Sequence, residues 1–121
     1  APQGGIQRGV YAYVNMIDNM KRSALIFASE YGHGVIVDSL IAADADVNLQ
    51  DYFGNTALLY ASIEGDGHII DSLIRANANV NIQGPGETTA LIWVSKTGNK
   101  AIVDALIEAD ADVNIVEPTT V

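Results

Sequence analysis

One of the two histidines of this sequence stands where it could suggest a metal site. His68 stands in the segment Gly65-Asp66-Gly67-His68, where it and Asp66 could begin a metal site. A protein zinc site is completed by three or four side-chain ligands, and the local sequence supplies no others. We therefore predict no bound metal and no cofactor.

The serines do not form a catalytic pattern either. Ser29, Ser62 and Ser95 recur at an equal spacing, and such recurrence is typical of packing positions rather than of a single activated nucleophile. The sequence has no cysteine, which excludes disulfides, thiolate catalysis and cysteine-based zinc sites. It also lacks a glycine-rich phosphate loop with the required Lys and Ser or Thr. The sequence predicts a protein that is not an enzyme.

The composition limits the class of protein and of partner. The 121 residues suffice for one domain, and 49% of them are apolar, which is enough to build a core. Six basic and fifteen acidic residues give a formal charge of −9. This charge argues against nucleic acid or an anionic membrane as partner, because phosphate groups are bound by Lys and Arg. A basic protein would be attracted to this acidic chain, although an acidic surface also favours solubility without any partner.

The sequence also bears on location. No apolar run approaches the ~20 residues that a membrane-spanning helix needs. The absence of cysteine is compatible with a reducing compartment. We expect a cytoplasmic or otherwise intracellular protein.

The elements that would position these side chains are internal repeats. The pattern of residues 38–48 returns at 71–81 and again at 104–114, with the same interval both times. The triplets at 23–25, 56–58 and 89–91 keep this interval, as do Gly32, Gly65 and Gly98. Three independent markers in one register indicate a repeat protein.

The repeats divide the whole chain. We predict full repeats at 18–50, 51–83 and 84–116, and a polar tail at 117–121. Residues 1–17 form an irregular leader, and Val14 and Asn15 match the end of a repeat, which indicates the tail of an earlier, degenerate repeat.

Each repeat carries signals for a turn followed by two helices. Thr56 is placed to cap the first helix through its hydroxyl, and Gly65 to end it in a left-handed conformation. Asp44, Asn77 and Asp110 stand at the end of each second helix, and Asp and Asn are the non-glycine residues that best tolerate a left-handed backbone. The sequence also predicts that Val47, Val80 and Val113 are buried between repeats.

The period and these motifs together resemble the ankyrin repeat family. The resemblance implies an all-α solenoid of stacked helix–turn–helix units with hairpin-like turns. The family's Thr-Pro-Leu-His motif is Thr56-Ala57-Leu58-Leu59 in the second repeat, and the other two repeats depart from it in the same way. In the family this His ties the repeats together by hydrogen bonds, so the aliphatic residue in its place implies that cohesion between these repeats depends more on apolar burial. The family usually carries a histidine after the helix-ending glycine, and His33 follows Gly32 in this way. The resemblance therefore implies a structural role for His33.

The resemblance also implies a function, which is non-enzymatic protein binding through a concave face of turn tips and first helices. Aromatic residues at open positions of that face are typical interface anchors. The residues that we assign to this face are Met20, Arg22, Tyr31, Tyr52, Phe53, Asn55, Ile63, Glu64, Thr88 and Lys96.

Three questions remain open in the sequence. Phe27, Tyr60 and Trp93 recur once per repeat on the first helix, and they could line the concave groove or pack in the core. Neither end carries an obvious polar capping repeat, which permits a second function, self-assembly by end-to-end stacking. The chain could also be the regulatory part of a larger protein.

Overall fold

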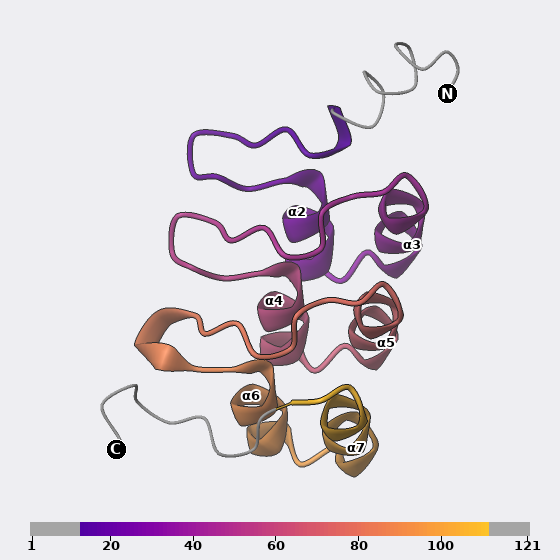
Figure 1. Ribbon diagram of the computed structural model, residues 1–121, viewed down its shortest axis with the longest axis vertical. Helices are drawn as coiled ribbons and strands as arrows, with labels where there is room; N and C mark the ends of the chain where they lie inside the picture. Colours follow the sequence, from indigo (N-terminus) through magenta and orange to yellow (C-terminus); the bar gives the residue numbers. More distant parts are fainter. Residues whose placement is uncertain (1–12, 112–121) are drawn as a thin grey trace.

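The computed structural model describes residues 13–111, and within them six helices form three stacked pairs (Figure 1). The first helices of the pairs, α2, α4 and α6, lie one above another, and the second helices, α3, α5 and α7, form a parallel column. Long turns project on the far side of the first column. The described part contains no strand, so the predicted all-α repeat architecture is confirmed. The helices are α2 Ala24–Glu30, α3 Gly34–Ala42, α4 Ala57–Glu64, α5 Gly67–Arg75, α6 Ala90–Thr97 and α7 Lys100–Glu108.

The first helix of each pair begins at a hydroxyl cap. The side chains of Ser23, Thr56 and Thr89 accept a hydrogen bond from the backbone N–H three residues later, at 3.2, 3.1 and 3.3 Å. Each cap satisfies one of the N–H groups that a helix start leaves without a partner. The prediction made for Thr56 is confirmed.

Left-handed residues end the helices as the sequence indicates. Gly65 lies at φ 73°, a conformation that glycine adopts without steric cost. Asp44, Asn77 and Asp110 lie at φ 65°, 64° and 70°, so the left-handed backbone indicated at the end of each second helix is confirmed. The chain therefore turns back after each pair at the same place.

The core runs through the stack between the two columns. Leu58, Ile70 and Leu73 are completely or almost completely buried in it, and Val47 and Val80 are buried between neighbouring pairs as predicted. Val113 lies outside the described residues, as do residues 1–12 of the predicted leader and the predicted tail at 117–121.

The aliphatic residues that replace the family's histidine behave differently along the stack. Ile26 and Leu59 are buried, whereas Ile92 in α6 is exposed. The recurring serines divide in the same way, because Ser29 and Ser62 are buried but Ser95 is exposed, which differs from the packing role predicted for all three. Ser95 and Ile92 lie on α6, the last helix of its column in the described part, so no described helix follows to cover them.

Candidate functional site

The turn before α2 is held by the carboxylate of Asp18. Its Oδ1 accepts hydrogen bonds from the backbone N–H groups of Met20 and Arg22, both at 2.9 Å. Its Oδ2 pairs with the Arg22 guanidinium at 3.1 Å. The hydrogen bond from the backbone N–H of Arg22 is the main cause that lowers the pKa of Asp18. Asp18 therefore fixes the direction of the Arg22 side chain.

From this turn, a line of stacked side chains runs along α2. The Arg22 guanidinium lies 4.5 Å from the centre of the Phe27 ring. The Phe27 ring stacks on Tyr31, with centroids 6.4 Å apart and planes 9° apart. A cation over an aromatic face is attracted by the ring's electron density. The line ends at Tyr31, which caps the C-terminus of α2 and is 64% exposed.

The turn before α4 is held by Asp51, which is buried. One carboxylate oxygen of Asp51 accepts from the backbone N–H groups of Phe53 and Asn55, both at 3.0 Å. The other accepts from the hydroxyl of Tyr60 on α4. Burial of the phenol, and next its hydrogen bond to Asp51, raise the pKa of Tyr60 to about 12. This network anchors the turn to the helix that follows it.

The tip of this turn presents two aromatic rings to solvent. Tyr52 is 68% exposed and Phe53 is 59% exposed, and their rings meet edge to face at 5.9 Å. The backbone N–H of Tyr52 donates to the carbonyl of Met20 at 2.9 Å, which joins the tip to the turn before α2. We call Tyr31, Phe27, Arg22, Met20, Tyr52 and Phe53 the aromatic row, because these contacts and the Asp18 turn connect them in this order.

Other residues assigned to this face are less accessible than expected. Asn55 is only 9% exposed, because its backbone is bound to the buried Asp51 and its side chain lies against Gly84 of the next turn. A Cβ atom on Gly84 would stand 2.9 Å from Asn55 Oδ1. Met20 and Ile63 are half-buried. Of the apolar and aromatic residues expected to contact a partner, Tyr31, Tyr52 and Phe53 are therefore the ones that are exposed.

An acidic hollow lies beside Tyr31, at the C-terminal ends of α2 and α4. It has a volume of about 520 Å³ and is lined by Glu30, Tyr31, Gly32, Glu64 and Asp66. Asp66 caps α5 by accepting from the backbone N–H of Ile69 at 3.2 Å. None of the ion pairs found among residues 13–111 involves Glu30, Glu64 or Asp66. The three carboxylates therefore face the hollow without a cationic partner from the described chain.

The third turn has a different shape. Pro85–Glu87 form a short turn in which Gly86 and Glu87 lie at positive φ, 70° and 61°, so it is not a regular 3₁₀ helix. Thr88 closes this turn by donating its hydroxyl to the carbonyl of Pro85 at 2.9 Å. On α6, the exposed Lys96 ammonium lies 4.8 Å from the centre of the Trp93 ring. Thr88 and Lys96 were assigned to the same face as the aromatic row, and no hydrogen bond, ion pair or ring contact found in the described part of the chain joins them to it.

Phe27, Tyr60 and Trp93 lie between the two alternatives that the sequence left open. All three are half-buried. Each has one side in the stack, while the other contacts a polar group near the turns or helix ends: Arg22, Asp51 and Lys96 respectively. They are therefore neither fully buried core residues nor fully exposed groove residues.

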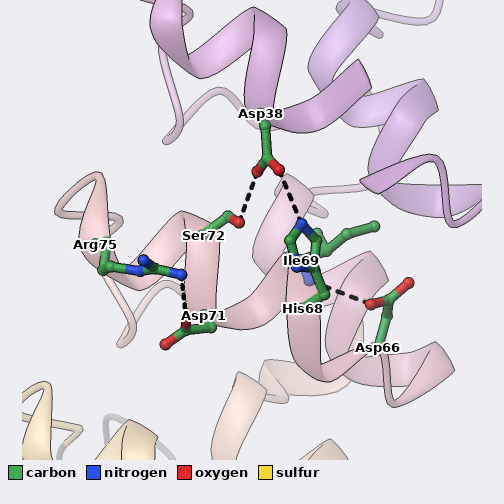
Figure 2. A network of polar contacts seen from close by, with 7 residues as sticks. All are labelled: Asp38, Asp66, His68, Ile69, Asp71, Ser72 and Arg75. Atoms are coloured by element: carbon green, nitrogen blue, oxygen red, sulfur yellow. Dashed lines mark hydrogen bonds and ion pairs between the residues drawn. The ribbon is translucent and has the colours of Figure 1, made fainter. Parts of the chain in front are cut away.

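The surroundings of His68 differ from the loop that the sequence suggested. His68 lies in the first turn of α5, and its Nε2 is 2.9 Å from Asp38 Oδ2 on α3 (Figure 2). Ser72 donates to the other oxygen of Asp38 at 2.7 Å. Among the described residues, no group of three or more His, Asp or Glu side chains could hold a metal ion. His33 is exposed at the start of α3 and makes no side-chain capping bond there.

Sequence reasoning missed this Asp38–His68–Ser72 contact. The only signal is that Val35 and Ala101 occupy the positions equivalent to His68, so His68 is unlike its counterparts in the other pairs. A polar residue that is unusual at a repeated position can thus indicate a contact with the neighbouring pair.

Comparisons with known proteins agree with the repeat pattern. The family model described as ankyrin repeats, in three copies, matches residues 25–117. No curated protein matches the chain. No helix within residues 13–111 is long and apolar enough to cross a membrane.

Proposed function

Since the chain belongs to the ankyrin repeat family, whose repeats generally act as protein–protein interaction modules and are typically not enzymes, we propose that it binds another protein through the aromatic row. The bound segment lies across the turn tips before α2 and α4 and along the exposed side of α2. Thr88 and Lys96 extend this surface towards α6.

The observation that carries the proposal is the exposure of three aromatic rings on a fixed framework. Tyr31, Tyr52 and Phe53 keep more than half of their surface open to solvent. Large apolar groups left in water at neighbouring positions are typical of interaction sites. Asp18 and Asp51 hold the turns through backbone hydrogen bonds, so little conformational entropy is lost when a partner binds.

The charges near the aromatic row favour a partner with basic side chains. The acidic hollow places Glu30, Glu64 and Asp66 beside the exposed ring of Tyr31. Within the chain itself, Arg22 and Lys96 already lie over aromatic faces, so rings of this surface accept cations. The formal charge of −9 speeds the encounter with a basic segment at low salt.

The proposal is tested with two matched triple variants. One replaces Tyr31, Tyr52 and Phe53 by Ala, and the control replaces Val35, Ile36 and Ile107, which are exposed apolar residues of α3 and α7. A displayed peptide library is selected against the wild-type protein, and the affinities of both variants for the selected peptides are measured. We expect the first variant to bind more than tenfold more weakly and the control to bind like the wild type, with Lys or Arg enriched among the peptides.

Other outcomes would reject parts of the proposal. Equal loss in both variants would mean that the aromatic row is not the binding site. Selected peptides without basic residues would reject the role of the acidic hollow. If no peptide is selected and the protein sediments as concentration-dependent oligomers, self-association becomes the better explanation.

A further inference from the structure

A polar clasp joins the second helices of the first two pairs (Figure 2). Asp38 of α3 binds His68 at 2.9 Å and Ser72 at 2.7 Å, both on α5. His68 and Ser72 are four residues apart on one face of α5, and Gly34 and Asp38 are four apart on α3. A Cβ atom on Gly34 would stand 2.8 Å from the His68 ring. The ring therefore lies against the bare backbone of α3, and we call these four residues the α3–α5 clasp.

A second polar tie joins the same two pairs on the opposite side of the layer. The backbone N–H of Tyr52, in the turn before α4, donates to the carbonyl of Met20, in the turn before α2, at 2.9 Å. The clasp connects the outer column of helices, and this bond connects the projecting turns. The first two pairs are thus linked at both edges, in addition to their apolar contact.

Neither tie can form at the next boundary, because the donors are replaced there. Ala101 and Ala105 occupy the positions of the third pair that are equivalent to His68 and Ser72, and alanine has no polar side-chain atom. Pro85 occupies the position equivalent to Tyr52, and proline has no backbone N–H to donate.

The two residues that α3 contributes to the clasp, a glycine and an aspartate, are nevertheless repeated on α5 at this boundary. Gly67 and Asp71 of α5 occupy the positions equivalent to Gly34 and Asp38. Asp71 pairs instead with Arg75 of its own helix. A Cβ atom on Gly67 would stand 3.6 Å from the Ile102 side chain, so apolar packing remains there. Within the described part of the chain, Asn81 Nδ2 does donate across this boundary, to the carbonyl of Asp110 at 3.2 Å.

We propose that α2–α5 form one cooperative unit held by the α3–α5 clasp and the Tyr52–Met20 bond, and that the stack opens between the α4–α5 and α6–α7 pairs. In a stack whose units contact only their neighbours, local opening occurs at the boundary with the weakest coupling. The His68–Asp38 pair is about half exposed and contributes modestly. Ser72 is only 9% exposed, so its bond to a carboxylate is the stronger component.

This division places the rings of the aromatic row, Tyr31, Tyr52 and Phe53, on the rigid unit. Thr88 and Lys96 lie on the part that opens, and they can therefore adjust to a partner after the rings have engaged. The division itself depends only on the contacts between pairs, and it stands whether or not the aromatic row is the binding site.

The test is native-state hydrogen exchange of the full chain at low denaturant concentrations. In the wild type, the amides of α6 and α7 are expected to share one opening event that leaves α2–α5 protected. Replacing His68 and Ser72 by Ala should give α2 and α3 an opening event of their own, with exchange about threefold to tenfold faster. Lys100→Ala is the control, because it removes an exposed ion pair within α7 and lies away from the α3–α5 boundary.

A gain of coupling provides the second test. Ala101→His with Ala105→Ser places the missing donors opposite Gly67 and Asp71, and should slow exchange in α6 and α7 by about threefold or more. If the double alanine variant does not fold, this graft decides alone. The proposal is rejected if α2–α3 and α4–α5 open separately in the wild type, if α2 and α3 of the double alanine variant exchange as they do in the Lys100→Ala control, or if the graft changes nothing.

Discussion

The hydrogen bond from Tyr60 to Asp51 offers a quantitative test of how the turn before α4 is held. Tyr60→Phe removes the hydroxyl and leaves one oxygen of a buried carboxylate without its donor, while the other oxygen keeps the N–H groups of Phe53 and Asn55. Hydrogen bonds to charged groups contribute about 1.5–3 kcal/mol. We expect the lower end of that range, a loss of about 1.5 kcal/mol in the free energy of unfolding, because Tyr60 is only half-buried.

The same bond predicts a dependence on pH. Burial and the bond to Asp51 raise the pKa of the Tyr60 phenol from 10.0 in a free tyrosine to about 12 in the folded chain. A group whose pKa is higher in the folded state stabilises fully below its unfolded pKa and loses that contribution as the pH rises. The contribution of Tyr60 is therefore complete at neutral pH and disappears between about pH 10 and pH 12.

The assay is urea unfolding followed by circular dichroism, for the wild type, Tyr60→Phe and Tyr52→Phe, at pH values near 7, 9 and 12. The difference between the wild type and Tyr60→Phe should be about 1.5 kcal/mol at the two lower values and close to zero at the highest. Tyr52→Phe removes an exposed hydroxyl of the same turn and should change stability by less than about 0.5 kcal/mol. Equal stability of the wild type and Tyr60→Phe at neutral pH, or a difference that persists near pH 12, would refute the reasoning.

Substitutions at three further positions test the local structure by equilibrium unfolding. Thr56→Ala removes the cap of α4 and should cost about 1 kcal/mol, whereas Thr56→Ser should cost little; equal effects would contradict the capping role. Asn77→Gly should stabilise by about 0.5 kcal/mol and Asn77→Val should destabilise, because residue 77 lies at φ 64°; the opposite order would refute this. Gly34→Ala should destabilise the wild type by displacing the His68 ring but should be neutral or stabilising, by up to about 0.5 kcal/mol, in a His68→Ala background; the same effect in both would contradict the contact.

The fold could be predicted from the sequence because the rules that it follows are local. Thr56 needs only the N–H three residues ahead to cap a helix, and Asn77 needs only its own backbone to end one. The match at Val14 and Asn15 also has a structural counterpart, because Asn15 Oδ1 accepts from the N–H of Asp46 just as Asn48 Oδ1 accepts from that of Asn79, both at 2.7 Å. The repeat boundaries themselves stay a prediction.

The surface was harder to predict because exposure depends on neighbouring pairs. The exposure expected for Tyr31, Tyr52 and Phe53 is confirmed, since turn tips and helix ends project from the stack. Asn55 was expected on the same open surface but is buried against the next turn, which a single repeat does not contain. The Asp38–His68 contact spans two repeats, so neither repeat shows it by itself, although His68 differs from its counterparts Val35 and Ala101. A repeat pattern fixes the backbone of each unit, but it does not determine the polar contacts between units.

The most direct test of the binding proposal is to map a bound segment onto the protein by NMR. With the isotope-labelled chain and a peptide selected against it, binding at the aromatic row should give the largest chemical-shift changes at Tyr31, Tyr52 and Phe53, with smaller ones at Glu30 and Glu64. Changes centred on the outer helices α3, α5 and α7, with the three rings unaffected, would contradict it.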